Sequence, residues 1–215
     1  MFKGNKILIV DEKGNKKRIF HSCFLKGIKI KFLSKNATVE LHRPLAKYRQ
    51  VKIICGENAY IKIGASKHLI EKFRLDASAK NSTCIIGNNF SSHECNFFLN
   101  KEPNLKIEIG EDVMIADKVR VRTTDSHTVY DKVSGEILNF GRDVKIGNHV
   151  WLAYGAIVLK GVTIADDIVI STKSLVNKDC LEQNTVYAGV PAKAVKKNVN
   201  WDRKIPVANQ GKQRA

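Results

Sequence analysis

The chain has 215 residues, of which 43% are hydrophobic, so it is long enough for one domain with a packed core and is not an intrinsically disordered chain. No segment approaches the roughly 20 apolar residues of a membrane span, and the apolar run at 7–10 is too short for a signal peptide, so we expect a cytoplasmic protein. The net charge of +16 predicts an anionic partner, but by itself does not distinguish a nucleic acid, a polyanionic sugar or a phosphate-bearing cofactor.

The cysteine pattern argues against a disulfide framework and against a zinc finger. The cysteines are odd in number and widely scattered, and no Cys-x-x-Cys pair occurs. We therefore expect free thiols in a reducing compartment, most of them buried as small core residues. They are Cys23, Cys55, Cys84, Cys95 and Cys180.

Residues 1–60 combine short β-type runs with basic, turn-rich segments. The runs occupy residues 6–10, 28–32 and 51–54, and residues 12–16 are an example of the segments between them. We expect irregular first coils that cap one end of the domain that follows.

A six-residue period organises residues 61–190. An aliphatic residue recurs at every sixth position from Ile146 to Val176, and a second small or apolar residue follows four positions after most of them. The copies at 109–121 are in phase with one another, and looser copies precede them. A triangular prism explains this period, which fits neither a helix nor simple alternation. Three six-residue sides form one coil, and the coils stack at the strand spacing of roughly 4.8 Å.

The period is interrupted once, after Val121. The next in-phase residue, Ile146, lies one residue beyond four hexads, and residues 123–144 have the polar, glycine-containing composition of a loop. Insertions into a solenoid project from one face and often carry function. We therefore expect functional side chains in this loop.

After Pro191 the pattern becomes basic and helical. For residues 191–215 we predict a short helical segment and then a flexible tail from about residue 206. The expected organisation is thus an N-terminal cap over 1–60, a β-helix over 61–190 and this C-terminal extension.

Several segments of the repeat region and its flanks carry a further signal. They are IGNHVWL at 146–152, IVLKGVTI at 157–164, SLVNKD at 174–179, AGVPAK at 188–193 and the loop segment TTDSH at 123–127. Together they resemble the hexapeptide-repeat acetyltransferases, with TTDSH resembling the loop that holds the catalytic histidine of that family. Residues 198–204 are similar to the C-terminal segment of the capsular sialic acid (polysialic acid) O-acetyltransferases. The resemblance covers about residues 105–204.

The resemblance implies a left-handed parallel β-helix that assembles as a homotrimer. It also implies that acetyl-CoA binds in clefts between neighbouring prisms and donates its acetyl group to a hydroxyl of a sugar. No metal is expected.

His127 is the residue expected to act as general base. A sugar hydroxyl is a poor nucleophile at neutral pH, and a histidine in a polar loop suits the removal of its proton as it attacks the thioester. Without the resemblance, a solvated loop histidine would be the simpler interpretation. Asp125, two residues earlier, either orients the imidazole or holds the loop.

Trp151 occupies an outward hexad position, so its large apolar surface is expected to be covered. A neighbouring subunit or the inserted loop is one expected cover, and a role as a wall of the acetyl or acceptor site is the functional alternative. His93 and Asn96, on a looser earlier coil, are candidate acceptor-binding residues, or else ordinary polar surface.

The cofactor-binding residues are expected at the corners of the last coils. Small residues there leave the backbone open to the pantetheine arm, and lysines supply cations for the phosphates. Lys160 stands where many members of the family have proline, so its expected contact with the cofactor departs from the family pattern. The candidates are Ala153, Tyr154, Lys160, Ser171, Thr172, Lys178 and Lys193.

The function expected from these features is O-acetylation of sialic acid in a capsular polysaccharide. A neutral sugar or a lipopolysaccharide unit is the alternative acceptor, with N-acetylation of an amino sugar behind it. A non-catalytic basic solenoid that binds a polyanion is a further alternative, although no nucleic-acid-binding motif occurs and we expect no nucleic acid partner. A zinc hydratase on the same prism, as in the γ-class carbonic anhydrases, would need three converging histidines, and the six histidines lack that spacing.

Overall fold

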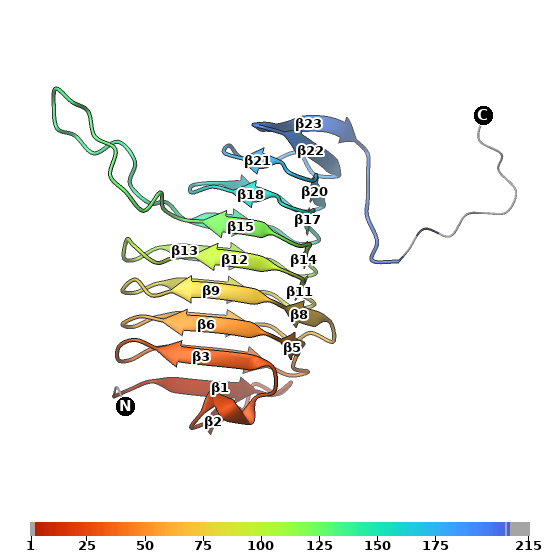
Figure 1. Cartoon of the computed structure of the whole chain (residues 1–215). Coiled ribbons are helices and arrows are strands. Elements are labelled where there is room, and N and C mark those ends of the chain that lie inside the picture. Colours follow the sequence, from red (N-terminus) through yellow and green to blue (C-terminus); the bar gives the residue numbers. More distant parts are fainter. Residues whose placement is uncertain (1–2, 205, 207–215) are drawn as a thin grey trace, which may run out of the picture.

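The strands build a prism of stacked coils. The computed structural model describes residues 3–204 and 206, and three sheets wind around one axis in the order A, C, B along the chain (Figure 1). Within each sheet the strands are parallel, except for a terminal antiparallel strand in sheets A and C. This is the parallel β-helix that the six-residue period predicts.

Each sheet takes one strand from each coil. Sheet A contains β1 (Lys6–Val10), β2 (Lys16–Ile19), β4 (Thr38–His42), β7 (Tyr60–Ile63), β10 (Thr83–Ile86), β13 (Lys106–Ile109), β16 (Val144–Ile146) and β19 (Thr163–Ile164). Sheet B contains β3 (Ile28–Phe32), β6 (Val51–Cys55), β9 (Phe73–Ala77), β12 (Cys95–Phe98), β15 (Val119–Arg122), β18 (Ile157–Val158) and β21 (Leu175–Val176). Sheet C contains β5 (Lys47–Arg49), β8 (Leu69–Glu71), β11 (Ser91–Ser92), β14 (Met114–Ile115), β17 (Trp151–Leu152), β20 (Ile168–Ile170), β22 (Thr185–Gly189) and β23 (Ala192–Lys197).

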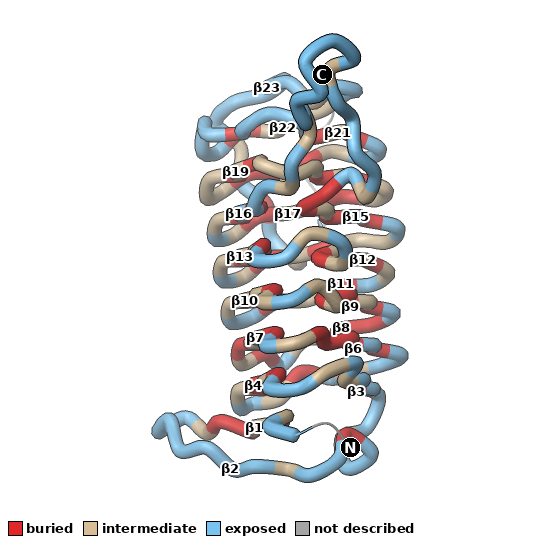
Figure 2. The backbone as a smooth tube through the Cα atoms, turned by 90° about the vertical axis from the view of Figure 1, so that its left-hand side faces the viewer, coloured by how far each residue is buried: buried red, intermediate tan, exposed pale blue. Residues whose placement is uncertain are grey.

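Successive coils place equivalent side chains on the axis of the prism. On sheet A an inward column pairs in register from coil to coil, and each of its members is at most 1% exposed. Because neighbouring side chains of a strand point to opposite faces, the residues between these face outward. Figure 2 shows buried positions recurring along the height of the stack. The column consists of Val39, Ile61, Cys84, Ile107 and Val144.

The early coils are longer than three hexads. Ile61, Cys84 and Ile107 pair at intervals of 23 residues, whereas Ile146 and Ile164 pair at the 18 residues of three hexads. The extra residues lie in the corners, so the six-residue period continues from coil to coil only after the inserted loop.

An asparagine ladder marks one of these longer corners. Asn58, Asn81 and Asn104 have φ of 55°, 57° and 63°, a left-handed conformation that asparagine tolerates better than most residues. Asn58 donates to the side-chain oxygen of Asn81 at 2.9 Å, and Asn81 donates to that of Asn104 at 2.7 Å. The ladder therefore joins three coils along their edge.

The prediction of irregular coils over residues 1–60 is wrong for most of that range. Strands β3 and β6 pair along five residues, and β1 pairs with β4 along another five. Within residues 3–60, only the β1–β2 hairpin and the short 3₁₀ helix η1 (Ser22–Phe24) depart from the coil pattern. The regular stack thus begins by Ile28, and its longer coil length hid it from a search for hexads.

The predicted C-terminal helical segment is a β-strand. Strand β23 pairs antiparallel with β22, whose edge would otherwise leave backbone groups unpaired. This pairing outweighs the helix propensity of its alanines and lysines. Apart from residue 206, the predicted flexible tail lies outside the described residues. Among the helices of the described part, none has the length and apolar character that a membrane span requires.

Candidate active site

The inserted loop, residues 123–143, leaves the prism between β15 of sheet B and β16 of sheet A. Figure 1 shows it as a long arm that projects beyond the coils. Tyr130 and Ile137 form an antiparallel bridge, and the Asp131 carboxylate accepts hydrogen bonds from the backbone of Val133 and Ser134 at the tip. The arm is therefore an ordered hairpin-like structure, whose tip is held by its own side chain.

One carboxylate holds both ends of the arm. Glu102, on the preceding coil, accepts a hydrogen bond from the Thr124 hydroxyl at 2.5 Å and another from the Gly141 backbone N–H at 2.6 Å. The Thr123 hydroxyl donates to the Phe98 carbonyl at 3.1 Å. Glu102 thus closes the root of the loop.

A second clamp surrounds Asp125. Its carboxylate accepts hydrogen bonds from the Lys160 ammonium and, at 3.1 Å, from the Asn139 side-chain amide. Lys160 also donates a hydrogen bond to the Asn139 backbone carbonyl at 2.6 Å. The hydrogen bond from Lys160 holds the pKa of Asp125 below its ordinary value. Of the two roles predicted for Asp125, holding the loop is the one that its contacts support.

Lys160 serves the loop instead of facing the cofactor. Its side chain is 13% exposed and is engaged by Asp125 and Asn139. It is not available to a phosphate in this arrangement, so its predicted cofactor contact finds no support. Its contacts give this lysine a role in holding the loop root.

His127 follows this clamp and lines a pocket of about 310 Å³. Asn139 donates to the His127 carbonyl at 2.8 Å, which fixes the backbone. Within the described chain, no hydrogen bond engages the exposed imidazole, so both ring nitrogens remain open to a ligand. The other lining residues are Lys101, Glu102, Thr124, Ser126, Thr128, Ile137, Asn139 and Phe140.

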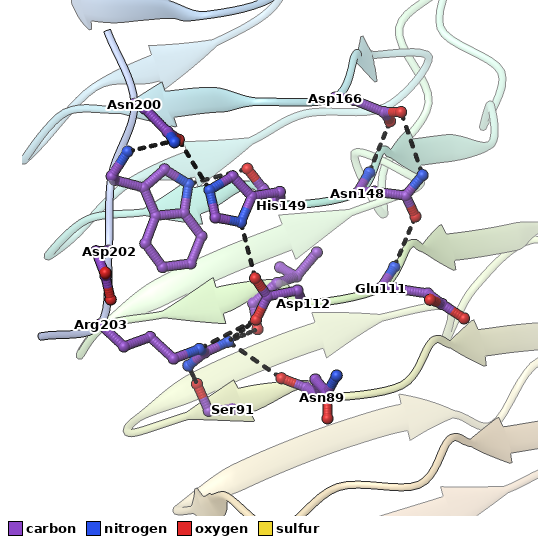
Figure 3. A network of polar contacts seen from close by, with 12 residues as sticks. Asn89, Ser91, Glu111, Asp112, Asn148, His149, Asp166, Asn200, Asp202 and Arg203 are labelled. Atoms are coloured by element: carbon purple, nitrogen blue, oxygen red, sulfur yellow. Dashed lines mark hydrogen bonds and ion pairs between the residues drawn. The ribbon is translucent and has the colours of Figure 1, made fainter.

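A separate network ties the C-terminal segment, residues 198–204, to sheet C (Figure 3). The His149 ring lies 2.7 Å from the Asp112 carboxylate through Nδ1 and 3.0 Å from the Asn200 amide oxygen through Nε2. The indole of Trp201 donates to the His149 carbonyl at 2.9 Å. Arg203 donates to Asp112 at 3.0 Å and also contacts Ser91. These contacts hold residues 198–204, the C-terminal strap, against the coils.

The network sets the charge of its two central groups. Burial disfavours the imidazolium of His149, but hydrogen bonds with Asp112 and Asn200 outweigh it and raise the pKa of His149. Burial likewise opposes ionisation of Asp112, yet hydrogen bonds with His149 and Arg203 leave its pKa below the ordinary value. Both shifts favour an ion pair at neutral to mildly acidic pH.

Trp151 lies on β17 and faces outward beside this strap. Its ring centroid is 6.3 Å from that of Trp201, with the planes tilted by 48°. The predicted covers were a neighbouring subunit or the inserted loop, whereas the cover seen within the chain is its own C-terminal segment. The tandem of Trp151 and Trp201 is an apolar wall on sheet C.

His127 and Trp151 are not brought together within one chain. The loop leaves at the corner between sheets B and A, which in a triangular prism is the corner opposite sheet C. Figure 1 shows the arm and the C-terminal segment on opposite sides. Any site that uses both residues must take them from two chains.

Four predicted cofactor residues do gather at the corner between sheets C and B. Ala153 and Ser171 occupy equivalent positions of successive coils and donate their N–H groups to the next coil at 2.9 and 2.8 Å. Tyr154 and Thr172 follow them directly. Lys178 and Lys193 are exposed elsewhere, Lys178 after β21 and Lys193 on β23.

Two lysines that the sequence analysis did not select complete this corner. The ammonium groups of Lys118 and Lys173 lie 5.5 and 5.1 Å from the centre of the Tyr154 ring. Both have φ of 60° and occupy the same corner on different coils. Their shared place in the coil repeat is the signal that would have found them.

The predicted acceptor residues lie on the earlier coils. Nδ1 of His93, whose side chain is largely exposed, is 3.8 Å from a carboxylate oxygen of Glu71. Asn96 lies on β12, in register between Arg74 and Arg120 on sheet B. The two residues flank the corner between sheets C and B, and neither lines the His127 pocket.

No family model matches the chain. It is 46% identical over 100 residues to a polysialic acid O-acetyltransferase of Neisseria meningitidis, covering 46% of each chain. It is 36% identical over 120 residues to a galactoside O-acetyltransferase of Escherichia coli, covering 55% of this chain and 56% of that protein. The chain thus spans about half the length of the curated relatives it matches.

The similarity to a solved structure extends over nearly the whole chain. The polysialic acid O-acetyltransferase OatWY superimposes with a TM-score of 0.74 at 27% identity, over 98% of this chain and 95% of that one. The match includes the coils of residues 1–60 as well as the hexad region. The resemblance to the hexapeptide-repeat acetyltransferases is confirmed, and the chain has their left-handed β-helix fold.

Proposed function

We propose that the chain is an acetyl-CoA-dependent O-acetyltransferase with His127 as its general base. The observation that carries this proposal is the pocket at the root of the loop, where an imidazole with free ring nitrogens stands on a backbone clamped by Asp125, Asn139 and Lys160. A positioned base of this kind typically contributes about 10²–10⁴-fold to a rate.

In the proposed reaction, a ring nitrogen of His127 takes the proton of the acceptor hydroxyl as that oxygen attacks the thioester carbonyl. The carbon–sulfur bond then breaks, the acetyl group stays on the acceptor oxygen, and the thiolate leaves with a proton from the imidazolium. No covalent enzyme intermediate is needed. Among the described cysteines, four are buried and Cys23 lies in the N-terminal cap, away from the loop.

We propose that the active site forms between the chains of a homotrimer. Its support is the placement of His127 and Trp151 on opposite sides of the prism. Neighbouring prisms arranged around a threefold axis can bring the loop of one chain to the Trp151–Trp201 wall of the next.

The corner between sheets C and B suits acetyl-CoA in its chemistry. Ala153 and Ser171 are small enough to leave room for an extended arm beside the coils, and Lys118 and Lys173 offer cations to phosphates. Lys178 and Lys193 remain proposed as further cations. Asp166 and Asp179, by contrast, lie at the other two corners, where their carboxylates accept backbone hydrogen bonds from Asn148 and Thr163.

We propose sialic acid in a capsular polysaccharide as the acceptor. The similarity to polysialic acid O-acetyltransferases and the net charge of +16 support it. The similarity to galactoside O-acetyltransferases favours the second candidate, a neutral sugar. We keep the expectation of a cytoplasmic location, in accord with five unpaired cysteines.

The test is release of CoA from acetyl-CoA, followed with a thiol reagent, with sialic acid oligomers, neutral sugars and no acceptor. His127→Ala should lower kcat at least about a hundredfold while the protein folds and assembles normally. His21→Ala is the matched control, because His21 is exposed at the opposite end of the prism. Near-normal turnover by His127→Ala would remove this residue from its assigned role.

Mixed assemblies test whether the site is shared. His127→Ala and Trp151→Ala should each be impaired alone, and co-expression of the two should restore part of the activity, because some interfaces then combine an intact loop with an intact wall. Restoration that fails in assembled mixed oligomers would place the whole site within one chain.

A further inference from the structure

The outer face of sheet B carries a column of mainly basic side chains, of which Asn96 alone is a predicted acceptor residue of the site described above. Lys29 pairs with Lys52, Lys52 with Arg74, Arg74 with Asn96, and Asn96 with Arg120. Because paired residues of parallel strands point the same way, these five side chains stand in one row along the prism axis. Resting on the proposed function, we propose that this row is the docking track of the acceptor, and that the acceptor is a linear polycarboxylate glycan.

The row is long and accessible. Four strand spacings of about 4.8 Å separate its ends, a length of about 19 Å, which exceeds a single sugar. Lys29, Lys52 and Arg120 are exposed, and no hydrogen bond or ion pair engages their side chains within the described residues. They are therefore cations without an internal partner.

One acid beside the row, Asp76, is already paired with a cation. Asp76 is 7% exposed and accepts hydrogen bonds from Arg74 at 2.9 Å and from the Ser78 hydroxyl at 2.7 Å. Lys72 and Lys118 extend the positive charge to the adjacent corner, two residues before Arg74 and Arg120, with Glu94 on the coil between them.

Within residues 3–204, neither of the other two sheets carries such a row. The equivalent outward column of sheet A alternates in charge, and that of sheet C is mainly apolar and partly covered by the strap. The sheet A column is Glu40, Lys62, Ile85, Glu108 and Lys145, and the sheet C column is Lys47, Leu69, Ser91, Met114, Trp151 and Val169. A polyanion is thus matched by one face of the prism.

The positive charge is concentrated where a polymer would extend. Residues 1–60 contain 14 Lys and Arg but four Asp and Glu, so they carry +10 of the total +16. These coils lie at the end of the stack away from the loop. A single sugar bound at His127 would gain little from them, because charges more than about 10 Å away are screened at 0.1 M salt.

The track leads to the proposed base. Arg120 is followed on the same strand by Arg122, whose guanidinium contacts the Ser126 hydroxyl at 3.3 Å, next to His127. A chain that lies on sheet B therefore reaches the root of the loop at its upper end. The row carries cations and an amide but no aromatic ring on which a nucleic acid base would stack, which favours a glycan.

The test compares two triple variants with the same loss of charge. One replaces the track residues, Lys29→Gln, Lys52→Gln and Arg120→Gln, and leaves Arg74 to neutralise Asp76. The other replaces exposed or half-exposed lysines of sheet A, Lys6→Gln, Lys62→Gln and Lys145→Gln. Light scattering and thermal melting are the controls for assembly and folding of both variants relative to the parent protein.

Binding is measured without turnover, using labelled long-chain polysialic acid, a sialic acid dimer and single-stranded DNA. The track variant should bind the long chain at least about tenfold more weakly than the parent and should bind the dimer as the parent does. The dissociation constant of the dimer divided by that of the long chain should therefore fall by the same factor. The sheet A variant should bind like the parent, and added salt should reduce the difference between the two proteins.

The outcomes separate this proposal from the proposed function. Equal losses of affinity in both triple variants would show that net charge, and not the row on sheet B, attracts the glycan. A track variant that binds the long chain like the parent would overturn the proposal. Tighter and track-dependent binding of DNA would overturn the glycan assignment. If the glycan binds along the track but no CoA is released, the track is supported and the proposed acetyltransferase function is not. If CoA is released but the track variant binds the glycan like the parent, the function is supported and the track is not.

Discussion

The imidazole of His149 lies flat on the indole of Trp201, with ring centroids 4.3 Å apart and an angle of 9° between the planes. The stack joins a corner of the β-helix to the C-terminal strap, and Asp112 and Arg203 fix it from below. Trp201 in turn covers part of Trp151. The strap thus belongs to the structure of the candidate site.

The ion pair between His149 and Asp112 should make the stability of the protein depend on pH. Because the folded pKa of His149 is raised from 6.5, its contribution is complete below that value and is lost as pH rises through the folded pKa. Because the folded pKa of Asp112 is lowered from 3.8, its contribution is present above that value and is lost as pH falls through the folded pKa. The ion pair therefore stabilises the protein most between pH 3.8 and pH 6.5, the ordinary pKa values of the two groups.

The measurement is Tm at about pH 6 and about pH 8.5, the mildly acidic and alkaline sides of the histidine window. The parent protein should lose more Tm across this interval than His149→Gln, which cannot gain the charge. Equal losses in the two proteins would contradict a contribution from His149. Trp201→Phe, which keeps an aromatic surface, should retain the pH dependence.

Removing Glu102 should free the arm without unfolding the prism. In Glu102→Ala both roots of the loop lose an acceptor, so we expect faster proteolysis within residues 123–143 and a fall in kcat/KM of at least about tenfold from misplacement of His127. Limited proteolysis and CoA release measure the two effects. Glu108→Ala, whose ion-pair partner is Lys106, serves as control; matching proteolysis rates in the two variants would refute the clamp.

Truncating the core at Phe97 should destabilise the whole stack. Phe97 is fully buried and meets Phe73 edge-on at 5.0 Å. Phe97→Ala should reduce the free energy of unfolding by about 3–5 kcal/mol, and Phe97→Leu by less, because the leucine leaves a smaller cavity. Denaturant unfolding at one fixed protein concentration measures the difference, since assembly contributes to apparent stability. A change within experimental error for Phe97→Ala would be inconsistent with this packing.

The five cysteines should differ sharply in reactivity. Cys23 is exposed, whereas burial raises the pKa of the thiols of Cys55, Cys95 and Cys180 to about 12 and also raises that of Cys84. A thiol reagent should therefore label the native protein rapidly at Cys23, and Cys23→Ser should abolish the fast phase. Rapid labelling of Cys23→Ser would show that a buried thiol becomes accessible.

The hexads from Ile146 to Val176 were sufficient to predict the prism, because each coil there is three equal sides. The first coils were missed because their corners hold extra residues, and a 23-residue interval such as Ile61 to Cys84 is not a multiple of six. Strand β23 was missed because the edge that it completes belongs to tertiary structure and outweighs local propensity.

The sequence indicates His127 as a candidate base but does not indicate the contacts that hold its loop. The interruption of the six-residue period and the resemblance of residues 123–127 to a catalytic loop both indicated the loop, and Asp125, two residues before His127, was named with both of its alternatives. The contact of Lys160 with Asp125 spans 35 residues, and the stack of His149 on Trp201 spans 52. Such pairs become neighbours only when coils are stacked, so no local pattern indicates them.

The antiparallel strands β2 and β23 have a consequence for the growth of the solenoid. A stack of coils ends in strands whose free edges invite another molecule to continue it into a filament. β2, with the sequence KKRI, closes one sheet at the first coil, and β23, with the sequence AKAVKK, closes one at the last. Two molecules that met end to end would bring these cationic strands together, so repulsion opposes polymerisation at low salt, and light scattering across a salt series would reveal any fibre that forms when the charges are screened.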